Sequence, residues 1–152
     1  LTESILVEMS AVNTNHPVVN AVLNQKFHLA REQGTSMIFK VGDMSGMRLN
    51  EEETVILLSN LLDNAIHECL KVVKAGRKAV IYIKLVQEGG KIIFSVKNPV
   101  VEKVQITDGI VLDSNGGMHG IGLSNVKAVV DKYGGDFVIS CDSEKFQAVV
   151  ML

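Results

Sequence analysis

The clearest pattern of apolar and polar positions lies between residues 50 and 76. Apolar residues recur there at spacings of three and four, the period of an α-helix with one buried face. Asn50 followed by Glu53 makes a capping box, and Gly76 is suited to end a helix. The pattern therefore predicts one long helix after Asn50. Its predicted inward residues are Val55, Leu58, Leu62, Ile66, Cys69 and Val73.

Two further segments have the helical period. Pro17 suits the first position of a helix that Gly34 ends, because the N–H that proline lacks has no partner there. Its predicted inward residues are Val18, Ala21, Val22, Phe27 and Leu29. Residues 121–133 predict another helix, ended by Gly134 and Gly135. Its predicted inward residues are Leu123, Val126, Val129, Val130 and Tyr133.

Runs of β-branched and aromatic residues predict the strands. They fall at 36–41, 79–86, 91–98, 136–141 and 146–152. Turn residues at 87–90 and at 142–145 join the second to the third strand and the fourth to the fifth as hairpins. Residues 99–119 show no convincing periodicity, and a loop of this length in a small domain is often an active-site lid.

The order of these elements predicts the fold class. Paired strands that do not alternate with helices argue against a doubly wound dinucleotide fold. They favour an α+β protein, a two-layer α/β sandwich in which helices cover one face of a mixed, mainly antiparallel sheet. Residues 1–12 read as the end of a preceding linker or dimerisation helix, and residues 13–152 as the domain.

Composition and charge narrow the class of protein. The chain has 152 residues, of which 47% are hydrophobic, enough for one domain with its own core. The net charge is −2 and the basic residues are spread along the chain, which argues against a nucleic-acid partner. No apolar run reaches the ~18 residues of a membrane span. Two cysteines without metal-site spacing suit a reducing cytoplasm.

The long predicted helix has a second, polar face. Four residues follow each other there at spacings of four, three and four, with Glu68 beside them: Asn60, Asn64, His67 and Lys71. Asparagine is a poor helix former and brings no evident folding benefit in mid-helix. Its carbonyl oxygen can ligate Mg²⁺, and its amide can donate to phosphate. On the pattern alone, a solvated face and a binding site stay equally open.

A glycine cluster precedes the last predicted helix. The segment GGMHGIGLSN at 116–125 contains four glycines. Glycines let backbone amides approach a phosphate, and the helix N-terminus favours negative charge, although a flexible loop would look the same. The chain has no GxxxxGK[ST] phosphate loop. The dinucleotide fingerprint also fails, because Asn125 holds its third glycine position.

Asn98, at the end of a predicted strand, completes a resemblance to a known family. The chain resembles the ATP-binding proteins that include histidine kinases, DNA gyrase, ninety-kilodalton heat-shock chaperones and mismatch-repair ATPases. NLLDNAIHE (60–68) is similar to the N-box of histidine kinases, and HGIGLSNVK (119–127) to their second glycine box. VKNPV (96–100) is a degenerate form of the Asp-rich first glycine box.

The resemblance covers nearly the whole chain from about residue 13 and implies the Bergerat-type fold. The nearest subgroup by resemblance is the peptide-sensing, quorum-type kinases. They similarly have a short lid, Asn in place of the first-box Asp, and a preceding segment like HPVVNAVLNQK (16–26).

The resemblance implies roles for individual residues. Asn60 and Asn64 would be catalytic, with Asn64 ligating the Mg²⁺ of bound ATP and Asn60 supporting it. His67 and Lys71 would contact phosphate, and Asn98 would face the adenine amino group. The hinge and phosphate-facing turn under the lid would be formed by Gly117, Gly120, Ile121, Gly122 and Leu123.

The implied reaction is transfer of the γ-phosphoryl group of ATP to a histidine on a separate dimerisation domain, with a response regulator downstream. The chain would be the cytoplasmic domain of a membrane-anchored bacterial sensor kinase. Hydrolytic relatives have a water-activating Glu where this chain has Asn60, which implies slow hydrolysis here. His16, just before Pro17, is interpreted as a helix-start residue and not as the acceptor. The alternatives are an anti-sigma-factor-type Ser/Thr protein kinase and a non-catalytic nucleotide-binding or interaction module.

Overall fold

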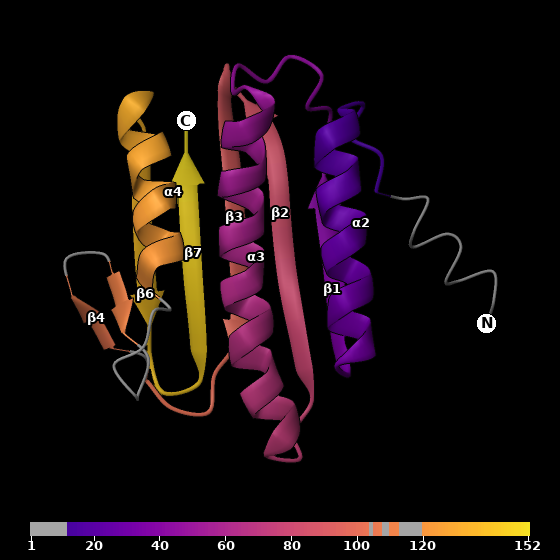
Figure 1. Cartoon of the computed structure of the whole chain (residues 1–152), viewed down its shortest axis with the longest axis vertical. Coiled ribbons are helices and arrows are strands. Elements are labelled where there is room, and N and C mark those ends of the chain that lie inside the picture. The colour runs from indigo at the N-terminus through magenta and orange to yellow at the C-terminus, as the bar shows by residue number, and fades with distance from the viewer. Residues whose placement is uncertain (1–11, 104, 108–109, 113–119) are drawn as a thin grey trace.

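A computed structural model describes residues 12–103, 105–107, 110–112 and 120–152. In this part of the chain, three helices lie together against one face of a five-stranded sheet (Figure 1). The helices are α2 (Pro17–Glu32), α3 (Glu51–Lys74) and α4 (Gly120–Lys132). The strands of the sheet are β1 (Thr35–Val41), β2 (Ala79–Glu88), β3 (Lys91–Pro99), β6 (Asp136–Cys141) and β7 (Lys145–Met151). None of the described helices is both long and apolar enough to cross a membrane.

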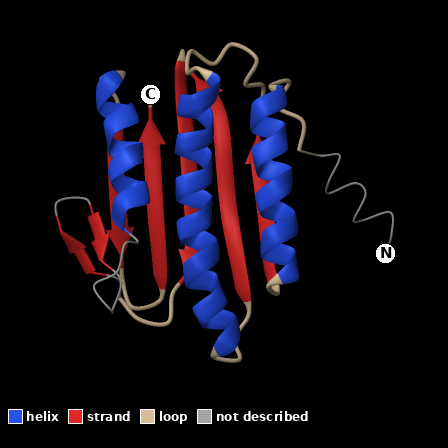
Figure 2. Ribbon diagram, in the orientation of Figure 1, coloured by secondary structure: helices blue, strands red, loops and turns tan. Residues whose placement is uncertain are grey.

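The sheet is mixed and mainly antiparallel, as predicted. Its strand order is β1-β2-β3-β7-β6 (Figure 2). Only β1 and β2 pair in parallel among these described strands, and the remaining neighbours are antiparallel. The predicted fold class, an α+β sandwich with helices on one face, is therefore confirmed.

Alternation along the strands decides which side chains meet the helices. In β3, the buried residues Ile92, Phe94 and Val96 alternate with half-buried ones. Successive strand residues point to opposite faces, so the buried set faces the helical layer. Asn98 continues this alternation and is 1% exposed, which places its side chain on the helix-facing side of β3.

The inward faces of two helices differ from those predicted. In α2, Ala21 and Leu29 are exposed, and Val19, Leu23 and Ala30 are buried in their place. In α3, the predicted Val55 is 41% exposed, and Leu57, Leu61, Ala65 and Val72 join the core. The reason is that α3 packs between α2 and α4 as well as on the sheet, so its buried stripe is wider and rotated from a single-faced pattern. The inward residues predicted for the last helix are buried, and Tyr133 is half-buried.

The segment predicted to lack periodicity contains a small second sheet. β4 (Gln105–Thr107) and β5 (Ile110–Leu112) pair as an antiparallel hairpin, and β5 lies against α4. Strands of three residues are too short to show the alternation by which a strand is recognised in a sequence.

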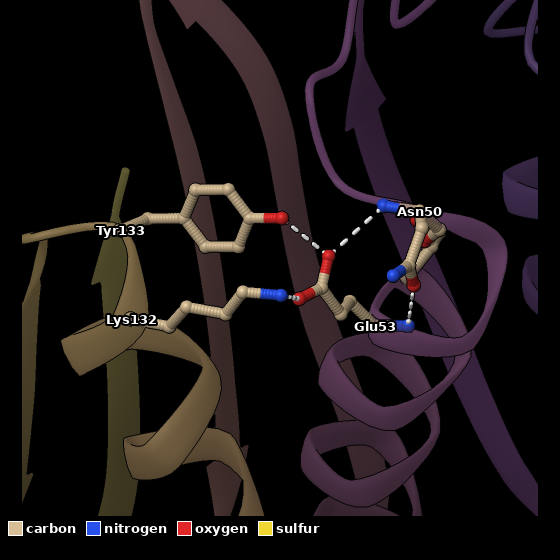
Figure 3. Close-up of polar contacts among 5 residues, drawn as sticks. Asn50, Glu53, Lys132 and Tyr133 are labelled. Carbon is tan, nitrogen blue, oxygen red and sulfur yellow. Dashed lines mark hydrogen bonds and ion pairs between the residues drawn. The ribbon is translucent and has the colours of Figure 1, made fainter.

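Glu53 joins the beginning of α3 to the end of α4 (Figure 3). The predicted capping box is present: the Asn50 N–H donates to Glu53 Oε1 at 3.0 Å, and Asn50 Oδ1 accepts from the Glu53 N–H at 2.7 Å. The same carboxylate accepts from Lys132 Nζ at 2.5 Å and from the Tyr133 hydroxyl. These four residues are called the Glu53 cluster below. Donation from Lys132 first, and then from Tyr133 and the Asn50 N–H, lowers the pKa of Glu53 from 4.5 to about 2.

The Glu53 cluster predicts an acid-sensitive component of stability. Because the folded-state pKa is depressed, the contribution is complete above pH 4.5 and is lost as pH falls towards about 2. Glu53→Gln should lower the free energy of unfolding at neutral pH and flatten its dependence on pH between these values. Urea unfolding of both proteins at several pH values measures this, with the exposed Glu52→Gln as the matched control. Equal pH slopes for wild type and Glu53→Gln would show that the cluster contributes nothing.

His16 begins α2, in agreement with its interpretation as a helix-start residue. It is the N-cap, and its Nδ1 accepts from the Val19 N–H at 3.2 Å. This satisfies one of the N–H groups that the first turn of a helix leaves without a partner.

Candidate functional site

The predicted site residues gather at one end of the two-layer fold. The start of α4 and the end of β3 lie at the same end of the molecule, opposite the Glu53 cluster (Figure 1). α3 carries the row of polar residues, and it contacts both α4 and β3. The site is therefore built from three elements that are distant in the sequence.

Asn64 is a buried residue with an unsatisfied oxygen. Its side chain is 5% exposed, and its Oδ1 has no hydrogen-bond partner among the described residues. A buried polar atom without a partner costs about 1–3 kcal/mol, so each such atom calls for an explanation, and a bound ligand or ion is one. A carboxamide oxygen can accept a hydrogen bond or ligate a hard cation, and Asn64 is thus placed to do either.

Asn98 shows the same feature on the neighbouring layer. Its Nδ2 donates to the Pro99 carbonyl at 2.9 Å, which fixes the orientation of the side chain. Its Oδ1 is buried and has no partner among the described residues. The end of β3 thus presents an acceptor on the helix-facing side of the sheet.

Asn60 lies at a close contact between α3 and α4. Its Nδ2 donates to the Ile56 carbonyl one turn earlier, at 2.8 Å. A Cβ atom added at Gly122 would lie 2.8 Å from Asn60 Oδ1 and 3.3 Å from its Cγ. Only a residue without a side chain fits there undisturbed, so Gly122 allows the beginning of α4 to rest against Asn60. Leu123, at 1% exposed, anchors this turn in the core.

The other residues of the glycine segment are described only in part. α4 begins at Gly120 and contains Ile121, of whose side chain the structure gives no description. Gly117, predicted to form the hinge, lies outside the described residues. The first N–H groups of a helix lack intrahelical acceptors and carry partial positive charge, which favours an anion at this position.

Glu68 belongs to the polar row, although it is not among the predicted site residues. It is 5% exposed, and its Oε2 lies 3.0 Å from Lys71 Nζ and 4.0 Å from His67 Nε2. The side chains of His67 and Lys71 are 45% and 35% exposed, so they lie at the rim of the row. The spacing of the sequence could have indicated Glu68 as a site residue. Asn60, Asn64 and Glu68 follow each other at intervals of four, so they lie along one side of a helix.

Comparison with known proteins assigns the chain to a family. Residues 49–152 match the family model described as the GHKL domain, so the chain belongs to the GHKL domain family. Members of this family bind ATP, usually with Mg²⁺. No curated protein sequence matches the chain.

Solved structures with a similar fold include a catalytic domain of a histidine kinase and two further histidine kinases. The catalytic domain of histidine kinase ThkA has a TM-score of 0.67 at 15% identity, over 92% of this chain and 93% of that one. The Erythrobacter litoralis EL346 blue-light activated histidine kinase has a TM-score of 0.63 at 13% identity, over 87% of this chain and 39% of that one. Acinetobacter baumannii histidine kinase AdeS has a TM-score of 0.61 at 15% identity, over 87% of this chain and 62% of that one.

At these identities the likeness shows the fold, and the predicted Bergerat-type architecture is confirmed. The chain spans less than two thirds of the E. litoralis and A. baumannii proteins, and so corresponds to a part of each. The resemblance to quorum-type kinases stays a prediction.

The donor set at the site fits ATP with Mg²⁺. The unpartnered Asn64 Oδ1 is the kind of oxygen that Mg²⁺ binds, and the unpartnered Asn98 Oδ1 is the kind of acceptor that an amino group of a base requires. The beginning of α4, which packs against α3, offers backbone N–H groups suited to phosphate.

Proposed function

We propose that the chain binds Mg-ATP and transfers the γ-phosphoryl group to a histidine on a separate dimerisation domain of the same kinase. The observation that carries this proposal is that two of the buried carboxamide oxygens without partners among the described residues, Asn64 Oδ1 on α3 and Asn98 Oδ1 on β3, belong to facing layers of the fold. Each unsatisfied buried oxygen destabilises the fold, and a ligand that bonds to both would remove this cost.

Each side chain has a role that follows from its position. Asn64 holds the Mg²⁺, and Asn60 supports it from the preceding turn against Gly122. When bound, Mg²⁺ neutralises part of the charge on the phosphates. Asn98 accepts from the adenine amino group, and its fixed Nδ2 leaves Oδ1 directed away from Pro99. His67 and Lys71, at the exposed rim, contact the phosphates.

The same residues favour transfer over hydrolysis. A water-activating base would have to accept a proton, and the neutral carboxamide of Asn60 does not. The nucleophile then comes from outside the chain, as the histidine of the dimerisation domain. Phosphoryl transfer requires mainly positioning and charge stabilisation, which this set of groups can supply. We further propose a cytoplasmic position in a membrane-anchored sensor kinase that phosphorylates a response regulator.

The chemical stability of the phosphorylated product tests this proposal. The intact kinase that contains the chain is incubated with ATP labelled at the γ-phosphate, and the labelled protein is treated with acid or base. Phosphohistidine is labile to acid and stable to base, and this is the expected result. A label on serine would favour the anti-sigma-factor type of kinase. Normal ATP binding without any label would favour a non-catalytic module.

Gly122→Ala should weaken ATP binding without unfolding the protein. The added methyl group displaces the Asn60 carboxamide and breaks its bond to the Ile56 carbonyl, a loss of about 1 kcal/mol that the better helix propensity of alanine roughly offsets. We expect stability to change by less than about 1 kcal/mol and ATP affinity to fall about tenfold. Urea unfolding and calorimetric titration measure the two quantities.

Gly46→Ala is the matched control, since a Cβ at Gly46 meets nothing within 4 Å. An affinity for ATP that is the same in both glycine variants would contradict the role given to the contact between Gly122 and Asn60.

A further inference from the structure

The face of the main sheet that points away from the helices carries a chemically distinct surface. No described helix or strand covers this face (Figures 1 and 2). Register and alternation place two adjoining rows on it. One contains Lys40, Lys84, Ser95, Val149 and Val138, and the other contains Ile38, Tyr82, Lys97, Gln147 and Ser140. These ten residues are called the open sheet face.

The charges of the open sheet face have one sign. Lys40 lies directly opposite Lys84 on the neighbouring strand, and Lys97 follows on the next strand in the adjoining row. None of the three is in an ion pair with a residue that the structure describes. The acidic residues on this side of the sheet strands, Glu88 and Asp136, are at the end that carries the β2–β3 turn.

The two ordinary explanations do not account for all three lysines. Lysine on an edge strand prevents sheets from pairing, which explains Lys40 on β1. Lys84 and Lys97 are on the inner strands β2 and β3, where that explanation does not apply. A solvated sheet face normally mixes both signs, and like charges directly opposite each other are destabilising. The concentration is also local, because the whole chain has a net charge of −2.

Apolar groups lie beside the lysines. Ile38 is 52% exposed and Tyr82 is 48% exposed, and Val138, which is 55% exposed, lies farther along the same face on β6. Lys97 Nζ lies over the Tyr82 ring, 5.1 Å from its centroid. A shallow cavity of about 190 Å³ opens between Ile38, Tyr82 and Lys97. Its floor includes Ser95, whose Oγ accepts from Gln147 Nε2 at 3.1 Å.

We propose that the open sheet face docks an acidic segment of a partner protein. Carboxylates of the segment pair with Lys40, Lys84 and Lys97, and an apolar side chain of the segment enters the cavity beside Tyr82. An anionic membrane would be attracted by the charge alone. The cavity, with a hydrogen-bonding floor fixed by Ser95 and Gln147, instead fits a side chain held in one place, so a protein segment is favoured. The surface is on the opposite side of the sheet from the nucleotide site, so both can be occupied together.

A binding measurement with a defined acidic peptide tests this proposal. The probe is a short fluorescent peptide in which glutamates surround one leucine, compared with the same peptide carrying glutamine for glutamate. Fluorescence anisotropy with the chain should show binding of the glutamate peptide only, weakened by salt. The variant Lys40→Ser with Lys84→Ser should bind it about tenfold more weakly, because each exposed pair contributes up to about 1 kcal/mol.

The control double variant also removes two positive charges, but from a different part of the protein surface. Arg31→Ser with Lys74→Ser alters two exposed residues at the ends of α2 and α3, on the helical side. Equal weakening by both double variants would show attraction to net charge alone and would overturn the proposal. The proposal would also be overturned if the wild type did not bind the peptide, whether or not it bound vesicles containing phosphatidylserine. Vesicle binding lost only in the Lys40 and Lys84 variant would assign the surface to a membrane.

Discussion

Replacing Asn64 by alanine should abolish Mg²⁺-dependent ATP binding while leaving the domain folded. The substitution removes the one buried oxygen on α3 that has no partner among the described residues. Residues that only orient the ligands of a metal ion already change its affinity by about 10–100-fold when they are replaced, so loss of a ligand should weaken Mg-ATP binding by at least about 100-fold. The unsatisfied oxygen is lost together with some packing, and we expect stability to change by less than about 1 kcal/mol.

Calorimetric titration with and without Mg²⁺ separates the metal ligand from the rest of the site. In wild type, Mg²⁺ should strengthen ATP binding, and in Asn64→Ala the two titrations should agree. Asn24→Ala, a half-buried residue on α2, is the matched control and should behave as wild type. Strong Mg²⁺-dependent binding by Asn64→Ala would exclude Asn64 as the ligand.

Replacing Asn98 by leucine should make the protein more stable and nearly unable to recognise adenine. Leucine removes a buried acceptor without a partner, at the loss of one hydrogen bond to the Pro99 carbonyl, so a net gain of about 1 kcal/mol is expected. ATP affinity should fall by about 10- to 100-fold, because the adenine amino group would face a side chain that accepts nothing. Thermal unfolding should show the increase in stability, and ATP titration should show the decrease in affinity.

Asn98→Asp separates the effect of losing the hydrogen-bond acceptor from the effect of changing the size and shape of the side chain. This variant keeps an oxygen in the same place and should keep the preference for ATP over GTP that Asn98→Leu loses. If Asn98→Leu binds ATP as well as wild type, the adenine lies elsewhere and the unpartnered oxygen needs another explanation.

Elements with long periodic patterns or strong end signals could be predicted from the sequence. The structure has both the predicted capping box and the predicted hairpin. The capping box depends only on Asn50 and Glu53, and the hairpin depends on a turn that contains Gly89 and Gly90, so each is determined by residues close together in the sequence. The buried faces of α2 and α3 were harder to predict from the sequence. Which side of a helix is buried depends on the elements that cover it, and so Leu29 and Val55 were assigned inward but are exposed.

The site could be predicted as a set of residues but not as an arrangement. Asn60, Asn64, His67 and Lys71 share one side of α3 by spacing alone, yet only Asn64 among them is fully buried. Burial of Asn64 depends on the packing of α3 against its neighbours, which no local pattern contains.

Contacts that join distant parts of the chain had no signature in the sequence. Glu53 meets Lys132 across 79 positions, and the open sheet face exists only through the register of five strands. The lysines of that face are spread along the sequence, and their concentration appears only when β1, β2 and β3 are aligned.

Asn64 is proposed to hold the metal ion of a bound nucleotide. Manganese in place of magnesium reports on this contact, because this paramagnetic ion broadens the NMR signals of nearby nuclei. We predict that Mn²⁺ with ATP broadens the side-chain amide signals of Asn64 and Asn60, and that Mn²⁺ alone leaves them sharp. Sharp Asn64 signals in the presence of saturating Mn-ATP, with broadening at another place on the protein, would contradict the account.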